Sequence, residues 1–206
     1  MMAEDAFSPA SREIIEWTDA WQDHAEDLAS PRALLIGDSI ARDYYPFVRD
    51  ALAGRYRVDR FCTSRFADDP FFRDEVGRYI RLCSYSVIHV NHGLHGQAYS
   101  VRAYQAAFDG LIRAALDSCR RVIVAASTPV GLKEDPDDPD PSRTAQVIER
   151  NEIAKAISCK YSVYYNDLYA AVDGVMGLKN VGDGTHFRHE GCVILGAKVA
   201  DAILTR

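Results

Sequence analysis

Short runs of β-branched and other apolar residues alternate along this chain with longer segments in which apolar residues recur at helical spacing. The short runs predict strands at 33–37, 56–61, 86–91, 121–127 and 162–166. The longer segments predict helices at 40–52, 71–82, 99–117, 144–159 and 190–204. Because parallel strands need a crossover between them, this alternation favours a parallel sheet of about five strands. We therefore expect an α/β fold, a three-layer α/β/α sandwich.

The segment before the first predicted strand has a helical pattern of its own. Its apolar residues recur with a helical period: Ile14, Trp17, Trp21, Ala25 and Leu28. Serine can cap a helix and proline suits its first turn, so Ser8-Pro9 is a fitting start. We expect residues 1–30 to carry an amphipathic helix packed on the domain.

Length and composition favour one domain. The 206 residues, 48% of them hydrophobic, are enough to form one hydrophobic core but too few for two of ordinary size. We therefore take 1–206 as a single domain. The segment 134–141 is rich in Asp and Pro and predicts a loop, either a solvated connection or a flap over a site.

Charge and segment composition restrict the partners. The first residues lack the pattern of a secretory signal, and no apolar run approaches the roughly 20 residues of a membrane-spanning helix. A net charge of −6 gives no general attraction for phosphate backbones. The five cysteines are scattered, which is typical of reduced thiols. We expect a cytoplasmic protein that binds neither membranes nor nucleic acid.

Polar residues follow the predicted strands, where parallel α/β sheets bind their ligands. Ser39 follows the first strand, Ser64 the second, the run 91–96 the third and the run 127–129 the fourth. Asp183 and His186 come on a turn before the last predicted helix. These segments are the candidates for a site at the carboxyl edge of the sheet.

Ser39, His186 and Asp183 have the side chains of a nucleophilic site. A serine hydroxyl is a weak nucleophile and needs a base, which works best when a carboxylate fixes its tautomer. The three-residue spacing from Asp183 to His186 lets one turn present both side chains. Each part also has a structural explanation, with Ser39 as a helix N-cap and Asp183-Gly184 as an ordinary turn.

Together these segments resemble the SGNH, or GDSL-type, hydrolase superfamily of serine esterases and lipases, which has a flavodoxin-like α/β/α sheet. Leu35 to Ser39 is similar to its nucleophile block. Asp183 to Phe187, with Gly191 and the run 195–197, is similar to its terminal Asp-x-x-His block and helix. Ala126 to Val130 resembles the stretch after its fourth strand.

The resemblance implies roles for the three candidate residues. Ser39 would be the nucleophile, His186 the general base and Asp183 its orienting partner. No cofactor is implied.

The two middle blocks of the superfamily are altered in this chain. The family usually has a glycine after the second strand whose amide faces the oxyanion, and here Ser64 or Arg65 would have to replace it. The family's Gly-x-Asn-Asp becomes Asn-His-Gly-Leu-His at 91–95, as in some divergent members. Aligning Gly93 with the family glycine puts His95 in the Asn position. We favour Asn91 as the oxyanion donor, with His95 close behind, because an amide donates in every protonation state.

Three histidines at every third position, His89, His92 and His95, raise the possibility of a metal site. His89 belongs to a predicted strand and Gly93 interrupts the next turn, so the spacing lacks the usual ligand signatures. We expect no metal.

The sequence therefore predicts a serine esterase that works through an acyl-enzyme. A short acyl ester, such as acetyl on a carbohydrate or another small soluble molecule, is the favoured substrate. The alternatives are a lipase or thioesterase, and a catalytically silent relative that only binds a ligand. A metal-dependent hydrolase and a nucleotide-binding domain are weaker, the latter because 37–42 has no glycine-rich phosphate loop.

Overall fold

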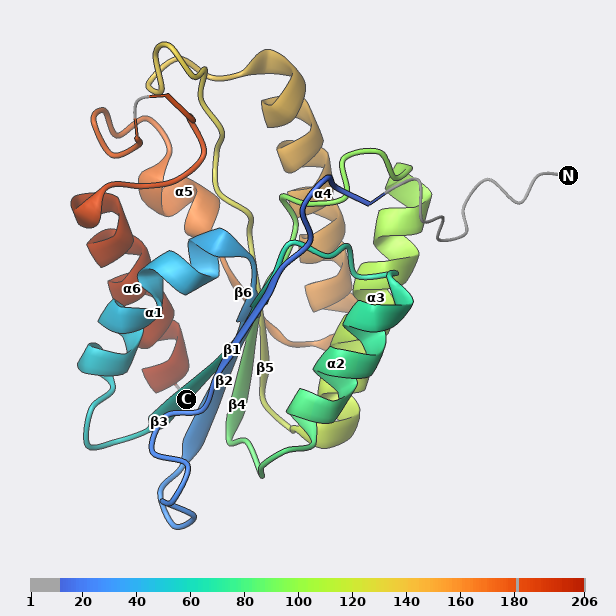
Figure 1. The fold of residues 1–206 in the computed structure, drawn as a ribbon, viewed down its shortest axis with the longest axis vertical. Helices are drawn as coiled ribbons and strands as arrows, with labels where there is room; N and C mark the ends of the chain where they lie inside the picture. Colours follow the sequence, from blue (N-terminus) through green and yellow to red (C-terminus); the bar gives the residue numbers. More distant parts are fainter. Residues whose placement is uncertain (1–11, 181, 206) are drawn as a thin grey trace, which may run out of the picture.

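A six-stranded, mostly parallel sheet runs through the centre of the computed structural model, which describes residues 12–180 and 182–205 (Figure 1). The strands are β1 (Thr18–Trp21), β2 (Arg32–Gly37), β3 (Arg57–Thr63), β4 (Val87–Asn91), β5 (Val122–Ala125) and β6 (Tyr164–Asn166). Their order across the sheet is β1-β3-β2-β4-β5-β6. Every neighbouring pair is parallel except β1 and β3.

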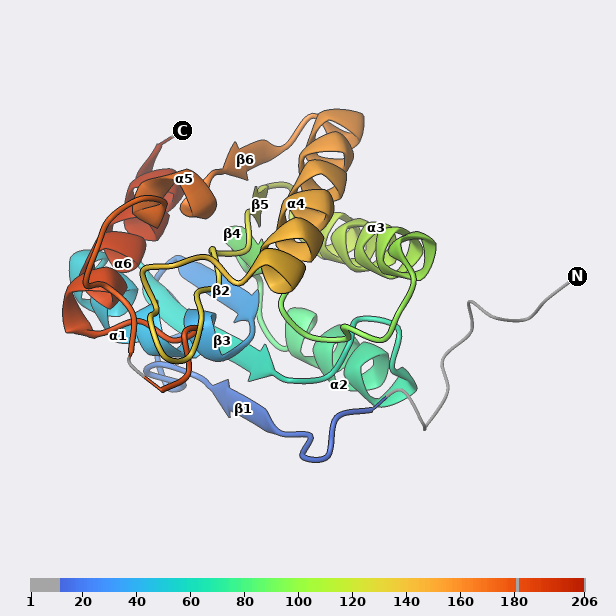
Figure 2. The same ribbon diagram turned by 90° about the horizontal axis from the view of Figure 1, so that it is seen from above.

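Helices cover both faces of the sheet (Figures 1 and 2). One face carries α1 (Ser39–Ala51), α5 (Leu168–Val172) and α6 (His189–Leu204). The other carries α2 (Pro70–Ile80), α3 (Val101–Ser118) and α4 (Pro141–Tyr161). The expected three-layer α/β/α sandwich is thus confirmed.

The apolar runs of the sequence become strands because both faces of a covered parallel sheet are buried. Every residue of β2 is buried. Ala33 and Leu35 pack with α1 and α6, whereas Leu34 and Ile36 pack with the helices of the opposite layer. Alternate residues of this one strand therefore belong to the two hydrophobic clusters on opposite faces of the sheet.

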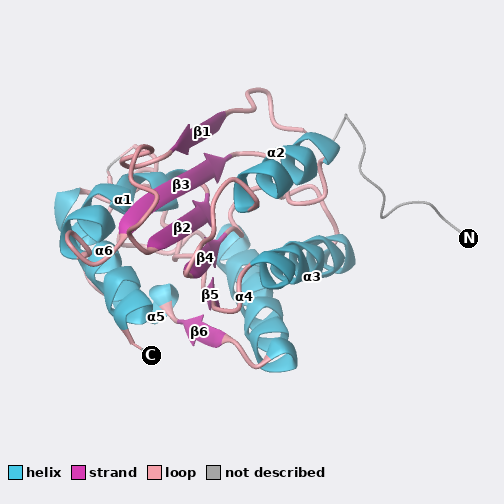
Figure 3. Ribbon diagram, turned by 90° about the horizontal axis from the view of Figure 1, so that it is seen from below, coloured by secondary structure: helices cyan, strands magenta, loops and turns pink. Residues whose placement is uncertain are grey.

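The helix predicted for the first 30 residues is wrong over its described part. Residues 18–21 form β1, which pairs antiparallel with β3 at the edge of the sheet (Figure 3). Ile14 and Leu28, counted as apolar contacts of a helix, are exposed. The open edge of β3 offers backbone hydrogen bonds that outweigh a weak helical pattern. Ser8 and Pro9 lie outside the described residues.

The sequence analysis also missed α5. This helix has only five residues, too few to show a helical period, and Asp167 caps it by accepting from the amide of Ala170. None of the helices among residues 12–180 and 182–205 has the length and apolar content to cross a bilayer.

A buried ion pair closes the end of the sheet opposite the strand carboxyl ends. The Arg32 guanidinium lies 2.7 Å from Asp59 Oδ1, and both side chains are almost fully buried. Tyr85 donates to the other oxygen of Asp59 at 3.0 Å. Arg32 also donates to the carbonyls of Asp23, His24 and Asp27, which ties the loop after β1 to the sheet.

Replacing Asp59 should therefore destabilise the whole domain. Asp59→Ala leaves the Arg32 charge buried without its partner, and we expect a loss of about 3–5 kcal/mol in the free energy of unfolding by urea. Asp50→Ala, which breaks the exposed pair of Arg49 and Asp50, is the matched control, with an expected loss below about 1 kcal/mol. Equal losses in the two variants would contradict the importance of the buried pair.

Candidate active site

Ser39 lies at the junction of β2 and α1, at the carboxyl end of a central strand. Gly37 makes this junction possible, because a Cβ there would lie 2.4 Å from Ala41 Cβ and 2.6 Å from the Asn91 carbonyl oxygen. Asp38 is the N-cap of α1 and accepts from the amide of Ile40 at 2.9 Å. Ser39 is therefore not the cap, and its hydroxyl is available for another partner.

His186 and Asp183, the candidate base and acid, lie on the turn before α6. Asp183 Oδ1 accepts from the amides of Thr185 at 2.6 Å and His186 at 2.8 Å, so the carboxylate organises the turn that carries it. Gly184 has a φ of 64°, and a Cβ there would lie 2.2 Å from the Gly131 carbonyl oxygen. The turn is thus held against the loop that follows β5.

The three side chains form a continuous hydrogen-bonded series. His186 Nε2 lies 2.7 Å from Ser39 Oγ, and His186 Nδ1 lies 3.1 Å from Asp183 Oδ2. A carboxylate only accepts hydrogen bonds, so Nδ1 carries the proton and Nε2 accepts from the serine hydroxyl. This is the tautomer in which an imidazole can take the serine proton.

Electrostatics keep the acid of the turn ionised. Burial acts to raise the pKa of Asp183, but the amides of His186 and Thr185 and the His186 ring outweigh it and lower that pKa. The pKa of Asp38, which is fully buried beside Ser39, is instead raised. Burial raises it, and this effect outweighs His95 and His186, which act to lower it.

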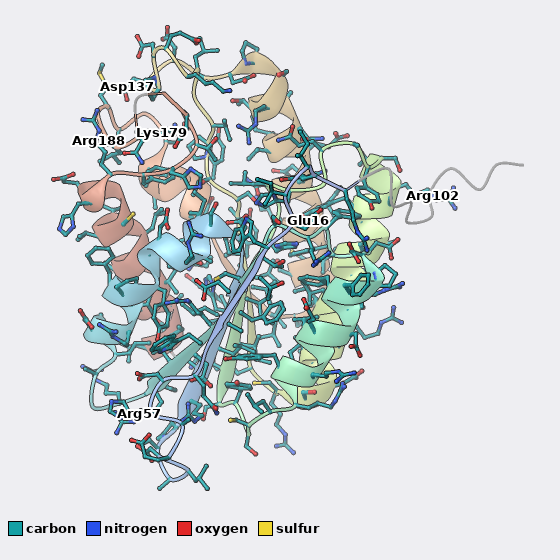
Figure 4. All side chains as sticks on the ribbon, in the orientation of Figure 1. Glu16, Arg57, Arg102, Asp137, Lys179 and Arg188 are labelled. Atoms are coloured by element: carbon teal, nitrogen blue, oxygen red, sulfur yellow. The ribbon has the colours of Figure 1, made fainter. Side chains whose placement is uncertain are left out.

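Residues 131–133, just before the 134–141 loop, support the turn of Asp183 and His186. The Gly182 amide donates to the Lys133 carbonyl at 2.8 Å, and the Gly131 amide donates to the Gly184 carbonyl at 2.8 Å. Asp140 ends the loop as the N-cap of α4. Figure 4 shows Asp137, Lys179 and Arg188 gathered at this end of the molecule, with Arg57 at the other end. The loop is an ordered part of the site surroundings.

Two of the predicted oxyanion donors have partners within the protein. The Ser64 amide donates to the Trp17 carbonyl at 3.2 Å, and its hydroxyl donates to Glu16 at 2.7 Å. The Arg65 amide donates to the Thr63 hydroxyl at 3.1 Å. The Ser64 contacts hold the segment before β1 against the end of β3. Because both amides already have acceptors within the protein, neither takes the place of the family glycine in this arrangement.

Asn91, the favoured side-chain donor, is also engaged. Its amide nitrogen donates to the Ala126 carbonyl at 2.7 Å, and the side chain is buried. Asn91 thereby bridges the ends of β4 and β5. The geometry shifts the preference for a side-chain donor from Asn91 to His95.

His95 lies in the loop after β4, and its Nδ1 is 2.7 Å from Glu13 Oε1. The loop is fixed by Arg150, which donates to the carbonyls of Gly93 at 3.0 Å, His95 at 2.7 Å and Gly96 at 2.6 Å. Sequence reasoning missed Glu13 and Arg150. Glu13 fell in a segment taken as helix, and no spacing signal connects α4 to a loop 54–57 residues away.

Gly93 has a packing role. A Cβ at this position would lie 2.2 Å from Ser127 Oγ and 3.2 Å from the Tyr104 hydroxyl. The absence of a side chain lets the loop after β4 lie against Ser127, which follows β5.

The three clustered histidines have separate partners. His89 Nε2 lies 3.2 Å from the Asn166 amide, His92 Nε2 lies 2.8 Å from the Arg65 carbonyl oxygen, and His95 contacts Glu13. Burial lowers the pKa of both His89 and His92 to about 3, which keeps them neutral. No group of three potential ligands able to hold a metal occurs in residues 12–180 and 182–205.

Comparison with known proteins identifies the fold. The sequence matches no protein-family model and no curated protein. Axe2, an acetylxylan esterase from Geobacillus stearothermophilus, superposes with a TM-score of 0.67 at 16% identity, covering 87% of this chain and 97% of that one. A GDSL-like lipase from Bacteroides thetaiotaomicron superposes with a TM-score of 0.66 at 16% identity, covering 84% and 87%. Catalytic mutants of Axe2, with a serine or an aspartate changed to alanine, are similar too. The chain shares the fold of these esterases and GDSL-like lipases, as its motifs predicted.

The hydrogen-bonded series predicts that Ser39 is unusually reactive. A fluorophosphonate should label Ser39, and Asp183→Asn should slow the labelling by on the order of 10⁴-fold, because an amide facing Nδ1 favours the wrong histidine tautomer. Intact mass and peptide mapping measure both effects. Asp201→Asn, on the exposed side of α6, is the control and should label at the wild-type rate. Labelling at another residue would remove Ser39 from the site.

Proposed function

We propose that this protein is a serine ester hydrolase in which Ser39, His186 and Asp183 form the catalytic triad. The observation that carries the proposal is the 2.7 Å contact between Ser39 Oγ and His186 Nε2, made by residues 147 positions apart. Packing alone has no need of a hydroxyl facing an imidazole whose far nitrogen is bound to a carboxylate.

In the proposed reaction, Ser39 Oγ attacks the ester carbonyl carbon while His186 Nε2 takes the hydroxyl proton. The tetrahedral intermediate then collapses, the bond to the alcohol oxygen breaks, and His186 returns the proton to the leaving alcohol. Water attacks the acyl-enzyme by the same route and releases the acid. Asp183 stabilises the imidazolium in both halves. No cofactor takes part in these steps.

The developing oxyanion needs donors, and two are proposed. Ser39 is the first residue of α1, where backbone amides lack intrahelical acceptors and the helix dipole favours negative charge. His95 is the proposed side-chain donor, with Asn91 and Gly93 shaping the loop behind it. One such donor contributes about 3 kcal/mol to transition-state stabilisation.

The proposed substrate carries a short acyl group, such as acetyl on a carbohydrate or another small molecule. Axe2 is named an acetylxylan esterase, which supports this choice by analogy of fold. Two cavities of about 420 and 440 Å³ lie along α3, against α2 and α4, and Ser39 lines neither of them. They are not placed to receive an acyl chain bound to the nucleophile. The net charge of −6 favours a small-molecule partner over nucleic acid.

Hydrolysis of p-nitrophenyl acetate tests the proposal. Ser39→Ala should reduce the rate to background, a loss on the order of 10⁶-fold in kcat, because the nucleophile is gone. Ser118→Ala, at the exposed end of α3, should keep the wild-type rate. Across acetyl, butyryl and octanoyl esters we expect kcat/KM to fall with acyl length.

Each competing function has its own outcome in this experiment. A rise of kcat/KM with acyl length would favour a lipase or thioesterase, which the similarity to a GDSL-like lipase also allows. A wild-type protein that is inactive on all three esters would instead be a silent, ligand-binding relative.

A further inference from the structure

Glu13 and His95 form a second carboxylate–imidazole pair beside the triad. The two residues are 82 positions apart, and their side chains meet at 2.7 Å between Glu13 Oε1 and His95 Nδ1. The His95 side chain is only 17% exposed, whereas Glu13 is 41% exposed. The pair thus joins the segment before β1 to the loop after β4.

Both partners are held in place by other contacts. The three hydrogen bonds from the buried Arg150 fix the backbone of the 93–96 loop. On the other side, the Glu13 amide donates to Glu16 Oε1 at 3.0 Å. Glu16 Oε2 accepts from the Ser64 hydroxyl at 2.7 Å, and the Trp17 amide donates to Ser64 Oγ at 2.9 Å. Glu16 lies in front of the sheet in Figure 4. The distance between Glu13 and His95 is therefore set by the fold on both sides.

The contact with Glu13 decides what His95 can donate. An ionised carboxylate accepts hydrogen bonds only, so His95 Nδ1 must carry a proton. A neutral ring then has no proton on Nε2 and can only accept there. His95 donates from Nε2 only as an imidazolium ion. Nε2 has no hydrogen-bond partner among residues 12–180 and 182–205 and is available to a ligand.

The charges around His95 favour that charged form. Burial acts to lower its pKa, but the Glu13 hydrogen bond and the nearby carboxylates outweigh burial and raise it. The carboxylates that act on the ring come from two segments: Glu13 and Glu16 lie before β1, and Asp38 is the N-cap of α1. The other titratable and charged groups beside the loop are His92, within the loop itself, and Arg150 of α4, which donates to the His95 carbonyl. Gly37 pairs with Asn91 in the sheet, so the loop after β4 that carries His95 leaves the sheet beside the β2–α1 junction that carries Ser39.

We propose that Glu13 is a positioning residue that holds His95 as a cationic donor to the oxyanion, so that the site works only while His95 is charged. The inference rests on the proposed ester hydrolase function and adds a control by pH to it. Activity would have an alkaline limit, because His95 loses its charge as pH rises through its raised pKa.

The pH dependence of kcat/KM for p-nitrophenyl acetate tests this control. Glu13→Gln removes the opposite charge and should move the alkaline limit down by about 1–3 pH units. Glu16→Gln removes the same charge three residues away without touching the ring, and should move the limit much less. His95→Asn provides a donor that does not titrate, so the alkaline limit should disappear while activity remains. His95→Phe should lower kcat by about 10²–10³-fold.

An alkaline limit that is the same in wild type and Glu13→Gln would overturn the proposal, as would full activity of His95→Phe. In either case, loss of activity in Ser39→Ala would still support the hydrolase function, so the two failures are distinguishable. A titration of the His95 ring protons by NMR in Ser39→Ala gives a readout independent of turnover. We expect a pKa above the ordinary value for histidine, and a lower one would contradict the role of Glu13.

Discussion

The site depends on one backbone constraint, which is that α1 begins immediately after β2 ends. Two residues, Gly37 and Asp38, separate the last apolar position of the strand from Ser39. Gly37 has no side chain to collide with Ala41 or with the Asn91 carbonyl, and Asp38 caps the helix by accepting from the Ile40 amide. Any side chain at position 37 would push α1 away from β4. The hydroxyl of Ser39 would then move from its 2.7 Å contact with His186.

The packing of α6 on α1 positions Asp183 and His186, the other two residues of the proposed triad. Gly196 permits this close approach, because a Cβ there would lie 2.5 Å from Phe47 Cβ, and Gly191 lets α6 fold against Phe187. The packing of α6 on α1 therefore fixes the position of the 183–186 turn, which directly precedes α6, relative to the start of α1. The same layer contributes to the stability of the core and to the alignment of the base.

The sequence was informative where a residue's environment is local. Strand and helix periods predicted the five parallel strands, and short motifs predicted Ser39 with the acid–base turn. The missed features rest on partners distant in the chain. β1 forms because β3 has an open edge, and Glu13 and Arg150 reach the loop after β4 from segments 54–82 residues away. The chemistry of Asn91 favours it as a donor to the oxyanion. Its side-chain amide already donates to the Ala126 carbonyl, 35 residues away in the chain, and no local pattern in the sequence indicates this contact.

Strand β1 also covers an edge of the sheet that would otherwise be open. It has four residues and covers one side of β3, which has seven, while β6 ends the other side of the sheet with three. Short edge strands are poor templates for the addition of further strands. If β1 detached on heating, it would uncover a longer row of free amides and carbonyls on β3. Aggregation of this protein would then start from a local opening at one edge, before the core unfolds.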